Sequence, residues 1–400
     1  MYCEQITLKS GKKVWSCVAD GPPDPVTGKR KQIPRRGKTK KEAMQRVREV
    51  IDSLNNDGID LSVSNKMPFQ NVAQEWIKEY ALTGVKKNSV RVRKKEINML
   101  CSKMALVPIG KISHAVYQRA INELAQDYER STVMGAHSAA RMIFRYAIRY
   151  KYIKDNPSID IIVPKKRKTV DEVKENPIEA LFLEKEELEN FLFAAKEFGL
   201  PLDKERFYLL ALTGMRSGEL CALQKEDLNF EENTIFIHKT LYNENNNMKE
   251  YELTPPKTMG SVRTIHVEKE VMNLLRKVVL RNDKHKLKYR KSYTDFDDGN
   301  FVFARDNGYP FAPKNITDRM RRLMKKTPIK KKATPHTLRH THVSLLTEAG
   351  VDLPTIMQRV GHEDVETTMR IYTHVTDKMK KDATQKRESF FGNILNDLSI

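Results

Sequence analysis

Two stretches without apolar periodicity interrupt the sequence and divide it into three segments. Residues 55–67 are polar and include a glycine, and residues 163–169 (VPKKRKT) are basic and bounded by a proline. Because neither stretch has a face to bury, one continuous core cannot run through all 400 residues. We therefore expect three domains, at residues 1–60, 67–163 and 176–400.

The first segment predicts a small β-sheet covered by one helix. Residues 14–18 are typical of a strand, a proline-rich turn follows at 22–28, and basic residues from 29 to 38 suggest a second strand. Thr39 and Glu42 have the spacing of a capping box, and apolar residues behind them repeat on one helical face. The basic run could be a solvated face, but with Trp15 nearby we expect a sheet that contacts DNA.

The second segment predicts a four-helix bundle. Apolar residues recur with helical spacing at 69–80, 89–101, 113–124 and 131–150, and Asn156-Pro157 ends the block. The exposed positions of 86–95 and 141–154 are strongly basic, which suits a surface that grips a nucleic-acid backbone.

The third segment mixes both kinds of element. It predicts helices at 184–197, 203–213, 315–325 and 336–349, and strands at 234–238, 262–267 and 301–303. We therefore expect an α+β, mostly helical, multidomain fold.

The charge balance indicates a polyanionic partner. The chain has 72 Lys and Arg against 52 Asp and Glu, a formal net charge of +20. Nucleic acid is the first candidate and an anionic membrane surface the second.

Several classes of protein are excluded. No apolar run approaches the ~20 residues that span a bilayer, and the N-terminus lacks the layout of a signal peptide. The four cysteines are scattered and form no Cys-x-x-Cys pair, which argues against a disulfide scaffold and the usual zinc spacings. We expect a soluble, intracellular protein with reduced cysteines.

Four local motifs in the third segment carry the candidate chemistry. They are TGMRSGEL with Arg216, PPKTMGSVRTI with Lys257, HTLRHT with His336 and Arg339, and GH followed by IYTH, with His362 and Tyr372. Each alone has a plain structural interpretation: a surface arginine, a solvated turn lysine, a basic helix edge, a helix-capping histidine and a half-buried tyrosine.

Together, in this order, the motifs resemble those of the tyrosine recombinases, the phage integrase family. The motif match covers about residues 205–375, and only Met215 and Val360 stand where the family often has leucine. The small basic sheet domain followed by a helical bundle also resembles the integrases of temperate phages and conjugative transposons. The resemblance implies an arm-binding first domain, a core-binding (SAM-like) bundle and a catalytic third domain.

The resemblance also implies a role for each site residue. Arg216 and Arg339 would clamp the scissile phosphate, because guanidiniums bind its oxygens bidentately and stay charged. Tyr372 would attack and become joined to the DNA 3′-phosphate. His336 would assist its deprotonation, Lys257 would protonate the leaving 5′-oxygen, and His362 would hydrogen-bond a non-bridging oxygen.

No cofactor or metal is expected, since the covalent linkage conserves the energy of the phosphodiester bond. The sequence has no phosphate-binding Gly-x-x-x-x-Gly-Lys loop and no carboxylate cluster suited to two-metal chemistry. A metal site at His336, His340, His342 and His362 is an alternative interpretation, but it leaves both arginines, Lys257 and Tyr372 unexplained.

The resemblance implies double-stranded DNA as the partner, a tetramer on that DNA, accessory excision or DNA-bending proteins, no membrane, and a cytoplasmic, nucleoid-associated location. The apolar face of residues 389–398 suits docking either on a neighbouring subunit or on its own core. A chromosome-resolution recombinase, a type IB topoisomerase-like enzyme and a catalytically silent DNA-binding regulator remain alternatives to an integrase. The sheet domain at 1–60 favours the integrase.

Overall fold

The structure is a computed structural model. It describes residues 1–8, 10–23, 30–56, 61–165, 178–244, 247–256, 259–361 and 365–396. The chain forms two compact units, Met1–Lys168 and Thr169–Ile400. The first unit contains two separate hydrophobic cores, one under the sheet and one in the bundle. The expected three-domain division stays a prediction.

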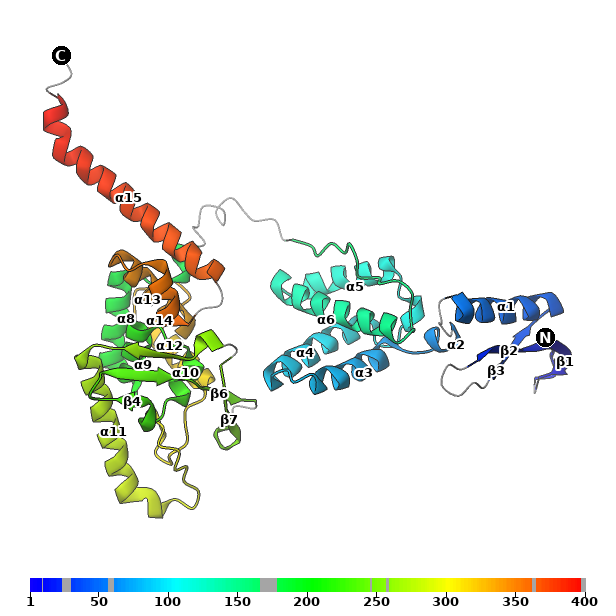
Figure 1. The fold of residues 1–400 in the computed structure, drawn as a ribbon, viewed down its shortest axis with the longest axis horizontal. Coiled ribbons are helices and arrows are strands. Elements are labelled where there is room, and N and C mark those ends of the chain that lie inside the picture. The colour runs from blue at the N-terminus through cyan, green and yellow to red at the C-terminus, as the bar shows by residue number, and fades with distance from the viewer. Residues whose placement is uncertain are drawn as a thin grey trace. The chain divides into compact units, whose positions relative to one another are not determined.

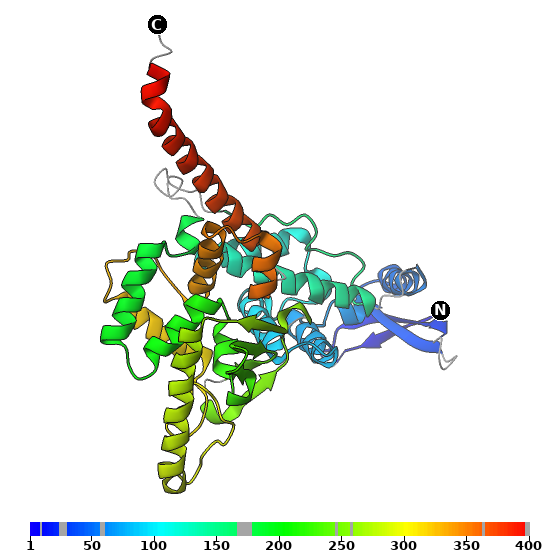
Figure 2. The same ribbon diagram turned by 60° about the vertical axis from the view of Figure 1, so that its left-hand side comes forward.

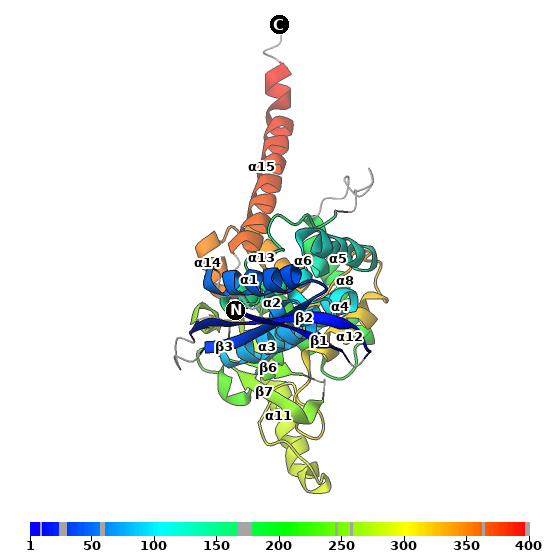
Figure 3. The same ribbon diagram turned by 90° about the vertical axis from the view of Figure 1, so that its right-hand side faces the viewer.

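The first unit begins with a three-stranded antiparallel sheet in the order β1-β2-β3, and α1 lies across one of its faces (Figure 3). The elements are β1 (Tyr2–Thr7), β2 (Lys13–Pro23), β3 (Arg30–Gly37) and α1 (Lys40–Asn56). The core between sheet and helix is small, with Cys17, Ala43 and Val47 fully buried. The expected sheet and helix are confirmed, and β1 is an additional strand.

The antiparallel register of β1 and β2 pairs Cys3 with Cys17, and the two form a disulfide with a Cα–Cα distance of 4.1 Å. The expectation that all four cysteines are reduced is therefore wrong for this pair. The residues are 14 positions apart, and only the strand register brings them together. Cys101 and Cys221 are free thiols.

The rest of the first unit is the expected helical bundle (Figure 1). Its helices are α2 (Leu61–Ser64), α3 (Phe69–Leu82), α4 (Lys87–Met104), α5 (His114–Asp127) and α6 (Arg130–Arg149). Tyr117, Phe69 and Phe144 are fully buried at its centre, and the ring of Tyr117 meets that of Phe144 edge-on. The predicted stripes of apolar residues thus form the core.

The second unit packs helices around a small antiparallel sheet in the order β4-β5-β8 and a separate hairpin, β6-β7. Its helices are α8 (Lys185–Phe198), α9 (Asp203–Thr213), α10 (Ser217–Ala222), α11 (Lys269–Tyr289), α12 (Pro313–Met324), α13 (Pro335–Glu348), α14 (Leu353–Val360) and α15 (Val365–Asn396). Its strands are β4 (Leu228–Asn229), β5 (Thr234–Ile237), β6 (Thr240–Asn243), β7 (Tyr251–Thr254) and β8 (Arg263–His266). Helices α11 and α15 extend from opposite ends of this unit (Figure 2).

One predicted strand is wrong. Phe301 forms only an isolated bridge to Gln224, and the chain turns immediately afterwards. Phe301, Val302 and Phe303 are all buried, so the apolar run fills the core without pairing in a ladder.

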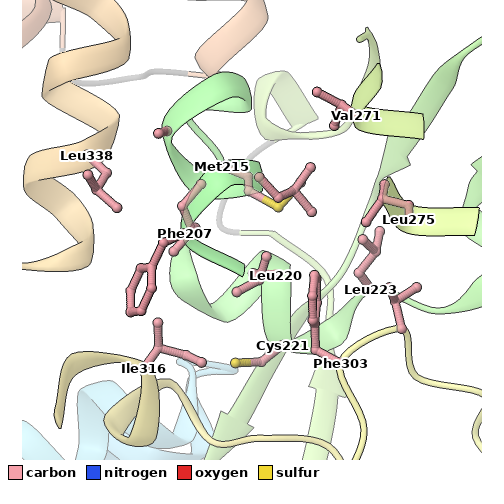
Figure 4. Packing of buried hydrophobic residues seen from close by; sticks show 14 of the residues in the cluster. Phe207, Met215, Leu220, Cys221, Leu223, Val271, Leu275, Phe303, Ile316 and Leu338 are labelled. Atoms are coloured by element: carbon pink, nitrogen blue, oxygen red, sulfur yellow. The ribbon is translucent and has the colours of Figure 1, made fainter. Parts of the chain in front are cut away.

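The core of the second unit lies directly beneath α9 and α10. Figure 4 shows Met215, Leu220 and Cys221 directed into it together with Phe207 and Phe303. Met215 and Leu220 flank Arg216 in the sequence and are essentially inaccessible to solvent. Burial on both sides therefore fixes the backbone that carries Arg216. Among the described residues, no helix combines the length and the apolar character that crossing a bilayer requires.

Candidate active site

Arg216 lies at the junction between α9 and α10. Helix α9 ends at Gly214, which has a left-handed backbone (φ +63°), and Arg216 is the N-cap of α10. Glu219, one turn into α10, accepts hydrogen bonds from the backbone N of Arg216 at 2.9 Å and from its Nη1 at 2.8 Å. The start of α10 thus holds both the main chain and the guanidinium of Arg216.

Three arginines from distant parts of the sequence meet at the C-terminal end of α14. Arg263 Nε donates to the carbonyl of Arg359 at 2.8 Å, Arg339 Nη2 donates to the carbonyl of Val360, and Arg216 Nη2 donates to that of Gly361 at 3.0 Å. Terminal helix carbonyls lack partners within the helix, and the negative end of the helix dipole favours cations. Successive carbonyls therefore set the spacing of the guanidiniums.

One buried carboxylate joins two of these arginines. Glu219 is 4% exposed, and besides Arg216 it accepts from Arg263 Nη2 at 3.0 Å and Nη1 at 3.4 Å. Burial alone would raise the pKa of Glu219, but Arg263 and Arg216 outweigh it and hold the pKa below its ordinary value. Glu219 is consequently ionised at neutral pH.

Arg339 lies deeper than Arg216. It is fully buried and also donates to the carbonyl of Gly214 at 2.7 Å, whereas the side chain of Arg216 is 37% exposed. Burial, reinforced by the positive charge of Arg216, lowers the pKa of Arg339 to about 9. An anion bound nearby would stabilise the charged guanidinium of Arg339, which burial disfavours.

His342 and Arg359 brace the backbone around this cluster. His342 Nδ1 is 3.0 Å from the carbonyl of Ala211, and Arg359 Nε donates to His342 Nε2 at 3.1 Å. Burial, with a further contribution from Arg359, lowers the pKa of His342 to about 3, so the imidazole is neutral. The arginine requires an unprotonated Nε2, which places the proton on Nδ1 and makes His342 a donor to Ala211.

His336 is the second residue of α13 and is exposed, while Arg339 on the next turn is buried. The ring of His336 stands edge-on to the buried His340 at a centroid distance of 4.5 Å. His342 is engaged with Ala211 and Arg359. In the described ranges, no group of three or more His, Cys, Asp or Glu side chains is arranged to hold a metal ion.

Tyr372 lies on α15, which packs against α13 and α14. It is half-buried beside a small core that includes Val343 and Val360. Further along α15, His374 Nε2 is 3.6 Å from Glu179 and Lys378 Nζ is 3.2 Å from Glu184. Both glutamates precede α8 in the sequence, so this part of α15 lies beside residues 179–184.

Lys257 and His362 lie outside the described residues. Among the described residues, β7 ends at Thr254, three positions before Lys257, and Gly361, directly before His362, accepts a hydrogen bond from Arg216. The structure therefore brings Arg216 and Arg339 together and packs the helix of Tyr372 against the helices that hold them.

Sequence analysis missed three residues of this site. Glu219 follows Arg216 at the spacing of a helix N-terminal carboxylate, which is a usable signal. Arg263 stands inside the motif of Lys257 but had no partner that the sequence could identify. Arg359 has no local signal, because its contacts are backbone carbonyls and His342.

Known proteins are similar to most of this chain. Residues 181–379 match the phage integrase family, and residues 6–54 match an arm DNA-binding domain. The integrase of Staphylococcus phage L54a is 32% identical over 362 residues, covering 86% of this chain and 99% of the relative. A probable integrase of prophage ps2 from Lactococcus lactis is 30% identical, covering 89% and 92% of the two chains.

Solved structures share the fold. The Tn1549 transposon integrase in complex with transposon right end DNA aligns with a TM-score of 0.62 and 22% identity, over 80% of this chain and 99% of that one. A lambda integrase tetramer bound to a Holliday junction aligns with a TM-score of 0.55 and 15% identity, over 92% and 94%. The chain therefore belongs to the phage integrase family, and it is a tyrosine-type site-specific DNA recombinase.

Proposed function

We propose that the protein integrates and excises a mobile genetic element by cutting and rejoining DNA through a 3′-phosphotyrosyl intermediate. The observation that carries this proposal is the convergence of Arg216 and Arg339 on consecutive carbonyls, of Gly361 and Val360. Two guanidiniums held at this spacing form a site for a phosphodiester.

The reaction follows from the residue types. The Tyr372 hydroxyl, deprotonated with the help of His336, attacks the scissile phosphorus. A bond forms between Tyr372 Oη and phosphorus, and the bond from phosphorus to the 5′-oxygen breaks. Lys257 gives its proton to that oxygen, while Arg216, Arg339 and His362 stabilise the charge on the non-bridging oxygens. Attack by a 5′-hydroxyl of another strand reverses these steps, so no net bond energy is lost.

Double-stranded DNA is the partner in this proposal. The β3 strand carries exposed Arg30 and Lys31, and the region matching an arm DNA-binding domain includes that strand. By analogy with the lambda integrase tetramer on a Holliday junction, four copies act together. The proposal includes accessory excision or DNA-bending proteins and a cytoplasmic, nucleoid-associated location.

The test uses a nicked duplex that contains an element end and loses a short fragment after cleavage, which traps the covalent complex. A denaturing gel is expected to show a protein–DNA adduct with the unchanged protein and none with Tyr372→Phe. Tyr289→Phe, which alters an exposed tyrosine of the same unit, is the matched control and is expected to form the adduct. An adduct that persists in Tyr372→Phe refutes the nucleophile assignment.

The same assay tests the arginines and the metal alternative. Arg216→Ala is expected to cleave about 100-fold more slowly or worse, with DNA affinity reduced far less, because the rest of the basic surface still binds. Cleavage that disappears with EDTA and returns with zinc or magnesium would support the metal alternative instead.

A chromosome-resolution role is the second candidate. It is favoured by a XerC-like tyrosine recombinase of Caldanaerobacter subterraneus that is 27% identical over 89% of this chain. Resolution joins two sites on one DNA molecule, whereas integration joins two molecules. Removal of residues 1–60 is expected to abolish integration between two plasmids, and unchanged integration would favour the resolution role.

A further inference from the structure

Arg263 is almost fully buried, yet it belongs to no core of apolar residues. It is 7% exposed, and its guanidinium donates to the carbonyl of Arg359, to that of Ser261 at 3.0 Å, and to both oxygens of Glu219. Its Nε and both terminal nitrogens already donate to carbonyls or to Glu219, so any contribution that Arg263 makes to cleavage passes through these groups.

Arg216 and Arg263 are both held by Glu219 and by the C-terminal end of α14. Glu219 Oε1 accepts from Nη1 of each arginine, and Glu219 Oε2 accepts from the backbone N of Arg216 and from Arg263 Nη2. At the end of α14, Arg263 binds the carbonyl of Arg359 and Arg216 binds that of Gly361. Arg263 and Arg216 thus face one another across a shared carboxylate and a shared helix end.

The charge of the shared carboxylate determines how Arg216 can act. If Glu219 had only Arg216 as a counter-ion, the buried carboxylate would draw that guanidinium inward and neutralise it. Arg263 supplies a second, buried counter-ion to the same carboxylate. The positive charge of the partly exposed Arg216 therefore stays available for a phosphate, while its orientation remains fixed.

We propose that Arg263 is a positioning residue for phosphate activation: it neutralises Glu219 and secures the end of α14, so that Arg216 presents a charged, oriented guanidinium to the scissile phosphate. This inference rests on the proposed function, in which Arg216 binds that phosphate.

The second unit offers a matched control. Arg206 on α9 is also fully buried and pairs with a buried carboxylate, Asp203, at 3.1 Å. Its guanidinium stacks 3.9 Å from the ring centroid of Phe311. Arg206→Met therefore removes a buried arginine of the same kind outside the cluster at α14.

The test is a double-mutant cycle measured as the single-turnover cleavage rate of the nicked duplex at saturating protein. Arg263→Met is expected to slow cleavage by about 30-fold alone, and by less than about threefold in the Arg216→Ala background, because both changes remove the same contribution. Arg206→Met is expected to have the same proportional effect in both backgrounds. Equal effects of Arg263→Met in both backgrounds overturn the proposal.

Two further measurements separate positioning from a loss of folding. Arg263→Lys keeps a cation beside Glu219 and is expected to cleave at least about threefold faster than Arg263→Met. On a duplex with a neutral methylphosphonate at the scissile position, the deficit of Arg263→Met is expected to shrink in parallel with that of Arg216→Ala, whereas misfolding would slow both substrates equally and contradict the proposal.

The outcomes also distinguish this inference from the function on which it rests. If Arg216→Ala cleaves at the normal rate, the proposed phosphate site is wrong. If Arg216→Ala is slow but Arg263→Met is fast, or slow independently of Arg216, only the role of Arg263 is wrong.

Discussion

Substituting alanine at Gly361 tests whether the end of α14 organises the active site. Gly361 has φ +62°, and a Cβ added there would lie 2.9 Å from Arg263 Nη1 and 3.1 Å from its Cδ. The left-handed backbone alone costs a non-glycine residue about 1 kcal/mol. The guanidinium of Arg263 must also move, and losing one charge-assisted hydrogen bond costs about 2 kcal/mol.

The expected loss for Gly361→Ala is therefore about 3 kcal/mol of unfolding free energy in the second unit. Gly350→Ala is the matched control, because Gly350 also follows a helix with a left-handed backbone, φ +81°, but a Cβ there meets nothing within 4 Å. It is expected to lose about 1 kcal/mol.

Urea titration, monitored by far-ultraviolet circular dichroism, measures the free energy of unfolding. Adduct formation on the nicked duplex measures activity. We expect Gly350→Ala to cleave within twofold of the unchanged protein and Gly361→Ala to cleave at least tenfold more slowly at temperatures where both are folded. Equal cleavage by the two variants would refute the reasoning that α14 sets the spacing of the arginines.

Three other outcomes are expected. The pKa of His342 is about 3 in the folded state and near 6.5 in the unfolded state, so the unfolded state takes up a proton first as the pH falls. The free energy of unfolding is therefore expected to decrease below about pH 6.5, by about 2 kcal/mol at pH 5, and His342→Gln is expected to flatten this part of the stability profile measured in urea. Tyr251→Phe removes the 2.7 Å hydrogen bond from β7 to Asp297 and is expected to cost about 1 kcal/mol of unfolding free energy. If Lys257, which follows β7 in the sequence, protonates the leaving oxygen as proposed, this variant is also expected to slow cleavage of a normal duplex more than that of a duplex with a 5′-bridging sulfur, a leaving group that needs no proton. Tyr309→Phe, whose partner Asp295 is exposed, is the control for an unchanged rate. Dithiothreitol, which reduces the Cys3–Cys17 disulfide, is expected to destabilise the sheet of the first unit by about 3 kcal/mol and to have no effect on Cys3→Ser. An equal effect on Cys3→Ser would show that the loss of stability does not come from this disulfide.

The elements that sequence could predict are those whose signal is local. The bundle helices have apolar stripes of helical period, and α13 and α14 begin at Thr-Pro and Asp-Leu-Pro, which are typical helix starts. Arg216 and Arg339 could be recognised because each stands in a distinctive local motif. Their convergence in space is a property of the fold, and within the sequence only the resemblance to the family predicted it.

What sequence missed depends on long-range pairing. Helix α11 has its apolar stripe in its first half only, and its charged second half, with Leu287 88% exposed, hides the helical period. The β6-β7 hairpin has short strands that gain stability from α10 and from the Tyr251–Asp297 contact, neither of which is local. The Cys3–Cys17 bond requires the register of β1 against β2, which the residue pattern alone does not define.

The anchors of the arginines could not be predicted for a different reason: most are main-chain carbonyls, which any residue supplies. The type of acceptor determines how much positive charge the arginines keep. A carboxylate that holds an arginine also neutralises it, whereas a carbonyl fixes its geometry and leaves its charge. At the end of α14, three guanidiniums bind carbonyls and the carboxylate of Glu219 pairs with two of them, Arg216 and Arg263, so this four-residue cluster is net positive. Anchoring by a second carboxylate would orient the arginines equally well but would reduce this positive charge and weaken the attraction for a phosphate. Burial lowers the pKa of Arg339, and a bound anion would stabilise its charged form.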